Sequence, residues 1–262
     1  MDKKYILFAG VNGAGKSTLY KENGCSVLQR INSDELLIES GGNWKNTSDQ
    51  MKAMKEAVRR MDEYFSNGVS FNQETTLTGR SIVKNIEKAK ALGYRVEVYY
   101  VGLESADLAV ERVANRVKNG GHGIKEEDIR RRYSESLKNL SKIISLCDKI
   151  RIFDNTKKYE KVAYFENGEE KFRKPCEWLD SVVPTRKEQH IKELKQNGFQ
   201  PSRGIISAME RIDKAYGKYT NLQTISDIYK GKEKALTPEI KSCAKEIGDS
   251  LKSQELSRVS YR

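Results

Sequence analysis

The sequence has few of the residues from which metal sites and disulfide frameworks are built. Among its 262 residues there are four cysteines, and no two of them have the Cys-x-x-Cys spacing that is typical of zinc sites. The pattern therefore indicates neither a structural zinc site nor a disulfide framework. We expect reduced thiols with structural roles.

Long apolar runs are also missing. No stretch approaches the roughly 18 apolar residues that a membrane helix needs, so no membrane span is predicted. The short apolar stretch in MDKKYILFAG runs directly into a glycine-rich loop, unlike a signal peptide. We find no internal repeat and no low-complexity tract. These absences predict a cytoplasmic globular protein without a membrane partner.

Positive charge, in contrast, is in excess. Lysine and arginine number 48 against 37 acidic residues, which gives a formal net charge of +11. Such an excess favours anionic partners, but these include nucleotides and sugar nucleotides as well as nucleic acids and membrane surfaces. The net charge therefore indicates an anionic ligand but does not indicate which kind.

Short apolar runs alternate with helical stretches over the first two thirds of the chain. This alternation predicts an α/β fold with a parallel sheet flanked by helices. The expected strands are residues 5–9, 26–31, 69–73, 96–101 and 149–153, followed by a hairpin about Asn167-Gly168. A helix within residues 48–65 is expected to cover the sheet with a row of apolar side chains: Met51, Met54, Val58, Met61 and Phe65.

The pattern changes near Val183. We expect residues 1–183 to form the nucleotide-binding domain and residues 184–262 to form a basic, helical C-terminal appendage. Its apolar positions would suit either a small bundle or a face packed on the first domain. A bundle this small would be marginally stable alone, which favours docking.

Residues 10–17, GVNGAGKS, match the phosphate-loop pattern G-x-x-x-x-G-K-[ST] between a predicted strand and a predicted helix. Glycines allow the backbone N–H groups to point inward, and the helix offers its positive end. Lys16 should reach the β- and γ-phosphates of ATP, and the hydroxyl of Ser17 should bind Mg²⁺. The residues expected to bind ATP are Gly10, Asn12, Gly13, Ala14, Gly15, Lys16, Ser17 and Thr18.

Asp34 follows the second predicted strand, at the edge of the sheet where α/β proteins bind ligands. Its carboxylate could accept a proton from a substrate hydroxyl or support Mg²⁺. The alternative is a helix start, with Ser33 or Asp34 as the capping residue.

The third predicted strand ends in NQETTLTGR. Glu74 occupies the usual place of a Walker-B acid, but Asn72 and Gln73 make the strand unlike that of a motor ATPase. With Thr76 and the nearby Arg80, Glu74 could instead hydrogen-bond a small substrate. The alternative is a strand-end turn capped by threonine.

Residues 106–133 predict two helices joined by a glycine-rich tip, the form of a lid that closes over ATP in small P-loop kinases. Neighbours on a helix are about 100° apart, so only one or two of Arg130, Arg131 and Arg132 can face inward together with Arg112 or Arg116. A solvated charged face and a nucleic-acid grip are the alternatives. His122 is expected to form hydrogen bonds in the lid loop rather than bind metal.

Five segments together resemble the zeta-toxin family of P-loop kinases, in the order in which that family carries them. The resemblance covers about residues 3–180. The segments are GVNGAGKST, INSDELL, QETTLTG, RVANRVKNGGHGIKEEDIRRRY and CDKIRIFDNT.

This resemblance implies transfer of the ATP γ-phosphoryl group to the 3′-hydroxyl of the amino sugar in UDP-N-acetylglucosamine. It implies Asp34 as general base, and Lys16 and Ser17 as phosphate and Mg²⁺ ligands. Glu74 and Thr76 would contact the substrate. Arg116 and either Arg131 or Arg132 would stabilise charge. It also suggests an antitoxin partner, or inhibition by the chain's own C-terminal region.

Two other functions are compatible with the sequence. The first is a P-loop kinase that acts on another nucleotide or metabolite. The second is a nucleic-acid-binding ATPase or switch, which only the net charge and the basic tail favour.

Overall fold

The computed structural model describes residues 3–22, 28–79 and 81–259. The chain divides into two compact units, Met1–Val182 and Val183–Arg262. Each unit has a hydrophobic core of its own.

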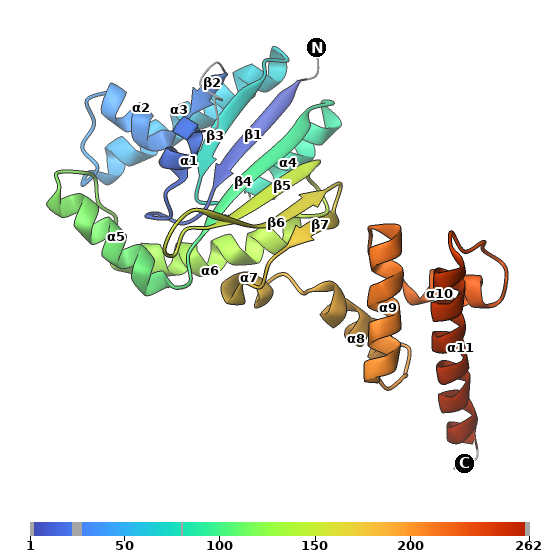
Figure 1. Cartoon of the computed structure of the whole chain (residues 1–262). Coiled ribbons are helices and arrows are strands. Elements are labelled where there is room, and N and C mark those ends of the chain that lie inside the picture. Colours follow the sequence, from blue (N-terminus) through green and yellow to red (C-terminus); the bar gives the residue numbers. More distant parts are fainter. Residues whose placement is uncertain (1–2, 23–27, 80, 260–262) are drawn as a thin grey trace. The chain divides into compact units, whose positions relative to one another are not determined.

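The first unit is built on a seven-stranded sheet in the described part of the chain, with the strand order β2-β3-β1-β4-β5-β6-β7 (Figure 1). The first five strands in this order run parallel, whereas β6 and β7 form the antiparallel hairpin expected about Asn167-Gly168. The predicted α/β class is thereby confirmed. The strands are β1 Lys4–Ala9, β2 Gln29–Ile31, β3 Phe71–Thr75, β4 Arg95–Gly102, β5 Lys149–Asp154, β6 Glu160–Glu166 and β7 Glu169–Arg173.

Helices cover both faces of this sheet. Along β1, successive side chains point to opposite faces, so Tyr5 and Phe8 lie on different sides. The ring of Tyr5 packs on Phe65 of α3, and that of Phe8 packs on Tyr20 of α1. The helices of this unit are α1 Lys16–Glu22, α2 Ser33–Glu39, α3 Thr47–Ser66, α4 Ser81–Ala91, α5 Ala106–Lys118, α6 Glu126–Ile143 and α7 Glu177–Asp180.

The apolar row expected on α3 is only half buried. Met61 and Phe65 lie in the core as predicted, but Met51, Met54 and Val58 are more than half exposed, so for these three the prediction is wrong. This helix of 20 residues is about 30 Å long, and its C-terminal half carries Met61 and Phe65 into the core. Its N-terminal half packs through Ala53 on α2 instead.

The parallel arrangement determines where the functional side chains meet. Strands β1, β2, β3, β4 and β5 all end at the same edge of the sheet. The loop at residues 10–15, Asp34, Glu74 and Asn155 follow or end these strands and are therefore brought together.

Up to residue 259, where the description of the chain ends, the second unit consists of four helices: α8 Arg186–Gln196, α9 Arg203–Tyr216, α10 Leu222–Tyr229 and α11 Pro238–Val259. A capping box between Thr185 and Glu188 starts α8, and Gly217 ends α9 in the left-handed conformation. The sequence favoured packing on the first domain over a small bundle, but the apolar side chains of these helices form the core of a bundle. This core contains Leu194, Ile205, Ile206, Ala208, Met209, Ile212, Leu222, Ile225, Ile228, Ile240, Cys243, Ala244 and Ile247.

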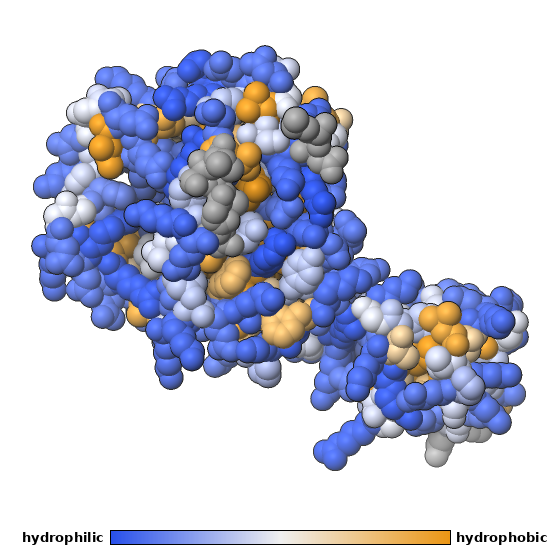
Figure 2. Space-filling model, turned by 45° about the horizontal axis from the view of Figure 1, so that its top comes forward, coloured by the Kyte–Doolittle hydropathy of each residue, from blue (hydrophilic) through white to orange (hydrophobic). Residues whose placement is uncertain are grey.

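One face of the molecular surface is mainly hydrophilic (Figure 2). Figure 2 shows a face dominated by hydrophilic side chains, with the hydrophobic ones in small separate groups. Within the described residues, no helix combines the length and the apolar character that crossing a bilayer requires.

Candidate functional site

The loop after β1 has the backbone conformation that its glycines predict. Gly10, Gly13 and Gly15 have φ angles of 138°, 82° and 100°, a region that side-chain-bearing residues rarely adopt. A Cβ atom on Gly10 would also overlap the carbonyl oxygen of Val101 in β4. Glycine is therefore required at these positions by both conformation and space.

This loop is held from one side by residues that follow β5. The side-chain amide of Asn155 donates to the carbonyl of Ala14 at 2.9 Å, and the hydroxyl of Tyr159 donates to the carbonyl of Gly15. In a trans peptide the N–H points away from the carbonyl, so the N–H groups of Gly15 and Lys16 face the opposite side. With the N–H of Ser17 in the first turn of α1, they line a concavity that is suited to an anion. The sequence analysis missed Asn155 and Tyr159, although their place after the last parallel strand was a usable signal.

Lys16, Ser17 and Glu74 lie together at this concavity. The ammonium of Lys16 is buried, donates to the carbonyl of Val11 at 3.1 Å and lies 3.9 Å from a carboxylate oxygen of Glu74. The hydroxyl of Ser17 is 3.0 and 3.1 Å from the two oxygens of Glu74. Burial lowers the pKa of Lys16, and the carboxylates of Glu74 and Asp34 only partly offset it. Burial makes the charged form of this ammonium less stable, and an anion that binds beside it would stabilise that form.

Glu74 is fixed by Arg30, a residue that the sequence analysis missed. The guanidinium of Arg30 donates to Glu74 at 2.7 Å, pairs with Glu35 at 2.9 Å and stacks on the ring of Tyr20 at 3.7 Å. Burial opposes the charge on Arg30, but the hydrogen bonds to the two carboxylates outweigh it and raise the pKa. A charged residue near the end of a predicted strand, next to the sheet edge that carries Asp34, was the signal that could have revealed it.

Asp34 lies in the first turn of α2. The capping residue is Asn32, whose side-chain oxygen accepts from the N–H of Asp34 at 3.0 Å, so the alternative in which Ser33 or Asp34 caps the helix is wrong. The Oδ2 atom of Asp34 is 2.8 Å from Nε2 of His122. Burial raises the pKa of Asp34, but His122 and the nearby cations outweigh it and hold that pKa below its usual range. Asp34 is therefore a carboxylate at neutral pH.

Two lid arginines face the phosphate loop. Arg132 of α6 donates to the side-chain oxygen of Asn12 at 3.1 Å. The Nε and Nη2 atoms of Arg116, on α5, are shielded from solvent and meet no hydrogen-bond acceptor among the described residues. Burial lowers the pKa of Arg116, although Asp34 and Glu74 oppose the shift. Guanidinium groups left unsatisfied in this way are suited to an anionic ligand.

Other lid arginines point elsewhere. Arg131 is 53% exposed and pairs with Asp128 and Glu135, both on its own helix. Arg130 pairs with Asp107 and Glu126. The structure thus brings Arg132 to the phosphate loop but does not bring Arg130 or Arg131 there. Consecutive side chains on a helix point in directions about 100° apart, so the three arginines cannot all face the loop. These paired side chains do not form a free basic grip for nucleic acid.

The threonine turn after β3 is a separate feature. The hydroxyls of Thr76 and Thr78 are 2.8 Å apart, and Asn139 of α6 donates to the carbonyl of Leu77 at 3.0 Å. Leu77 itself is buried with a φ of 58°. The turn is thus fixed between β3 and the lid, close in sequence to Glu74. The candidate substrate residue Arg80 lies outside the described residues.

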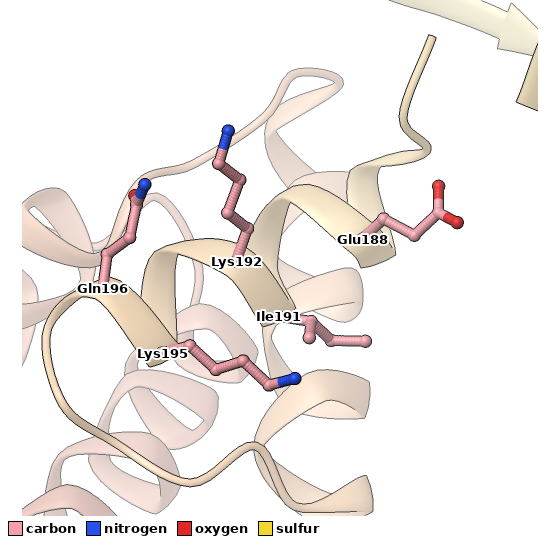
Figure 3. Close-up of a pocket in the computed structure, with 5 residues that line it drawn as sticks. All are labelled: Glu188, Ile191, Lys192, Lys195 and Gln196. Atoms are coloured by element: carbon pink, nitrogen blue, oxygen red, sulfur yellow. The ribbon is translucent and has the colours of Figure 1, made fainter. Parts of the chain in front are cut away.

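Two hollows elsewhere do not coincide with this site. One of about 410 Å³ is lined by five side chains of the single helix α8, shown in Figure 3. Another, of about 430 Å³, lies at the opposite end of the sheet, where Lys90 and Asp148 form an ion pair. We place the candidate site at the phosphate loop, because Lys16, Glu74 and Arg116 converge there.

The fold is that of a P-loop kinase-like protein. It has a glycine loop between β1 and α1, parallel strands that end beside this loop, and a helical lid. Comparison with known families agrees, because the model described as "Zeta toxin" matches residues 39–169, half of the chain. The chain belongs to the zeta toxin family. The matched residues include Glu74 and the lid, whereas the phosphate loop and Asp34 precede them.

One sequence relative and two solved structures are also similar to this chain. An uncharacterized protein of Haemophilus influenzae is 32% identical over 133 residues, which are 51% of this chain and 94% of the relative. Two crystal structures of AvrRxo1-ORF1 with AvrRxo1-ORF2, both 15% identical, share the fold. The complex with sulphate ions has a TM-score of 0.55 and covers 84% of this chain and 78% of that chain. The complex with ATP has a TM-score of 0.53 and covers 70% of this chain, which spans 64% of that chain's length.

Proposed function

We propose that the protein is an ATP-dependent kinase that transfers the γ-phosphoryl group to a hydroxyl of a small molecule. One observation carries this proposal: three cations, Lys16, Arg116 and Arg132, converge with the carboxylate of Asp34 at the phosphate loop. The two carboxylates beside them, Asp34 and Glu74, leave one positive charge uncompensated. Such a site favours a polyphosphate and provides a base next to it.

ATP and Mg²⁺ fit this arrangement. A similar solved structure contains ATP, which supports ATP as the phosphoryl donor here. For the metal, the hydroxyl of Ser17 and the carboxylate of Glu74 lie side by side, and oxygen atoms are the ligands that Mg²⁺ prefers. Ser17 and Glu74 would hold the ion. Bound Mg²⁺ would neutralise part of the phosphate charge.

The chain's own residues then account for the transfer. The Asp34 carboxylate accepts the proton of the acceptor hydroxyl, whose oxygen bonds to the γ-phosphorus while the bond to the leaving ADP oxygen breaks. Lys16, Arg116 and Arg132 stabilise the negative charge on the transferring group and on ADP. The proton taken up by Asp34 is released to solvent after the product leaves.

For the acceptor we propose the 3′-hydroxyl of UDP-N-acetylglucosamine. Membership in the zeta toxin family supports this acceptor, and the threonine turn containing Thr76 supplies hydroxyl groups close to Glu74 for a polar substrate. We further propose that a toxic kinase of this kind is held inactive by a partner chain. The similar solved structures, which contain two different chains, support this idea.

The test is incubation of the protein with ATP, Mg²⁺ and either UDP-N-acetylglucosamine or a metabolite extract, followed by mass spectrometry. We expect UDP-N-acetylglucosamine to gain one phosphoryl group. A phosphorylated species found only in the extract would identify another acceptor and overturn the sugar-nucleotide proposal.

The control variant is Lys16→Ala, which should abolish ATP turnover because it removes the cation beside the transferring group. Both tryptophans of the sequence, Trp44 and Trp178, lie in the first unit, so their fluorescence shows whether this unit stays folded. Wild-type turnover in a folded Lys16→Ala variant would contradict the kinase proposal.

A further inference from the structure

The tip of the lid contacts the element that carries Asp34. His122 lies between α5 and α6 and reaches Asp34 of α2, 88 positions earlier in the chain, at 2.8 Å. Next to it, Gly123 is buried against the ring of Trp44, in the loop that connects α2 to α3. A Cβ atom on Gly123 would come within about 3.0 Å of that ring and closer still to Val117. The lid therefore rests on the α2–α3 segment through two adjacent residues.

The contact with Asp34 uses only one carboxylate oxygen. Oδ2 faces His122, whereas Oδ1 has no hydrogen-bond partner among the described residues. The side chain of Asp34 is 42% exposed, so the carboxylate remains accessible from solvent. An ionised carboxylate can only accept hydrogen bonds, which makes Nε2 of His122 the donor and fixes the ring in its Nε2–H form.

The backbone at the lid tip keeps His122 in place. Gly120, with a φ of 81°, turns the chain at the end of α5, and the N–H of Gly121 donates to the carbonyl of Arg116 at 2.9 Å. Gly121 also packs against the side chain of Arg116, where a Cβ atom would be 2.6 Å from Cγ. His122 and the unpaired guanidinium of Arg116 are therefore set by the same turn.

We propose that His122 is a positioning residue that couples lid closure to the general base: when the lid closes, His122 binds Oδ2 of Asp34 and leaves Oδ1 directed at the acceptor hydroxyl. This inference rests on the proposed kinase function, since it gives Asp34 a hydroxyl to deprotonate. During the transfer Oδ1 takes the hydroxyl proton, and His122 keeps its own proton throughout. The same turn places Arg116, so closure brings the base and a phosphate-binding cation into position together.

The kinetic test compares four proteins with ATP, Mg²⁺ and UDP-N-acetylglucosamine: wild type, His122→Ala, His122→Gln and Lys125→Ala. We expect His122→Ala to lower kcat by on the order of tenfold to a hundredfold, because a slightly misplaced base is far less effective. KM for ATP should stay near the wild-type value. His122→Gln keeps an N–H donor at the end of its side chain and should recover part of the lost kcat. Lys125, an exposed lid residue, serves as the matched control and should have no effect when changed to alanine.

A second measurement does not depend on activity. Hydrogen exchange of the amides of residues 119–124 reports how firmly the lid tip is held. His122→Ala and Asp34→Ala should each accelerate this exchange, and the double variant should be no faster than either single one, because both remove the same bond. Lys125→Ala should leave the exchange unchanged.

The outcomes separate the two proposals. Unchanged exchange in His122→Ala would overturn the coupling, and so would an unchanged kcat. A kcat above that of wild type would also overturn it, and would show that His122 blocks Asp34 instead of positioning it. If the wild-type protein phosphorylates no acceptor, the proposed function fails, and hydrogen exchange alone then decides whether His122 ties the lid to Asp34.

Discussion

At the scale of single residues, the charges near the phosphate loop are mostly paired, and Arg116 is the exception. Glu74 is held by Arg30, and Asp34 by His122, but two nitrogen atoms of Arg116 have no acceptor in the described part of the chain. Burying a cation without its hydrogen bonds costs free energy, which a bound phosphate would recover. The site is therefore arranged for a ligand more than for the stability of the ligand-free protein.

The first prediction concerns the base. Asp34→Asn keeps the size of the side chain but removes its ability to accept a proton, so kcat should fall by on the order of a hundredfold or more while KM for ATP changes little. Steady-state kinetics with the acceptor saturating would measure both. A variant that lost ATP binding and kept kcat would show that Asp34 acts through Mg²⁺ or ATP and is not the base.

At the scale of elements, the methionines of helix α3 differ in burial. Met61 of α3 lies against Tyr5 in the core, whereas Met54 on the same helix is 61% exposed. Only the C-terminal half of α3 therefore contributes to the core beneath the sheet, and its N-terminal half contributes a packed Ala53 and an apolar surface.

Met61→Ala should lower the free energy of unfolding of the first unit by about 2–5 kcal/mol, through lost burial and a cavity. Met54→Ala is the matched control and should change it by less than about 0.5 kcal/mol. Denaturant unfolding followed by tryptophan fluorescence measures the first unit alone, because both tryptophans lie there. Equal effects of the two variants would contradict the burial pattern.

In the second unit, a buried polar pair links two helices. His190 of α8 and Asp213 of α9 are 2.8 Å apart and almost fully buried, and Asp213 also accepts from the N–H of Thr220. Removing the imidazole leaves a buried carboxyl oxygen without its partner. Polar pairs of this kind are sensitive to the loss of one member.

His190→Ala should therefore destabilise the second unit by roughly 3 kcal/mol or more. Thermal unfolding of the full chain, followed by circular dichroism, should show one transition move to lower temperature while the tryptophan transition stays in place. Arg211→Ala removes a surface ion pair with Glu246 and should leave both transitions where they are. A shift of the tryptophan transition in His190→Ala would show that the two units do not unfold independently.

At the scale of the whole molecule, the two units have separate hydrophobic cores. A unit with its own core does not need the other one for burial of its apolar side chains. This bears on the role of residues 183–262, for which structural support, recruitment of a partner and inhibition of the kinase are the three candidates.

Deletion of residues 183–262 should leave the tryptophan unfolding transition of residues 1–182 close to that of wild type, because the two units have separate hydrophobic cores. We expect ATP turnover to be unchanged as well. Aggregation or a large loss of stability would favour structural support. Faster turnover and greater toxicity in cells would show that the second unit inhibits the first.

The sequence by itself determined the class of fold and the position of the phosphate loop. Alternating apolar runs require buried parallel strands, and GVNGAGKS between a strand and a helix has one well-known conformation, since its glycines permit what other residues cannot. The hairpin about Asn167-Gly168 followed from local turn chemistry. The strands, the phosphate loop and the hairpin depend on residues that are neighbours in the chain, so local sequence patterns were sufficient to predict them.

Only the tertiary structure decided which side chains meet. Arg30, Asn155 and His122 reach the site from segments far apart in the chain, and no local pattern gives the distances between them. Likewise, the sequence could state that only one or two of the consecutive lid arginines face inward, but the placement of α6 selected Arg132. The physical reason is that periodicity fixes the angle between residues on a helix, whereas packing against other elements fixes the rotation of the whole helix.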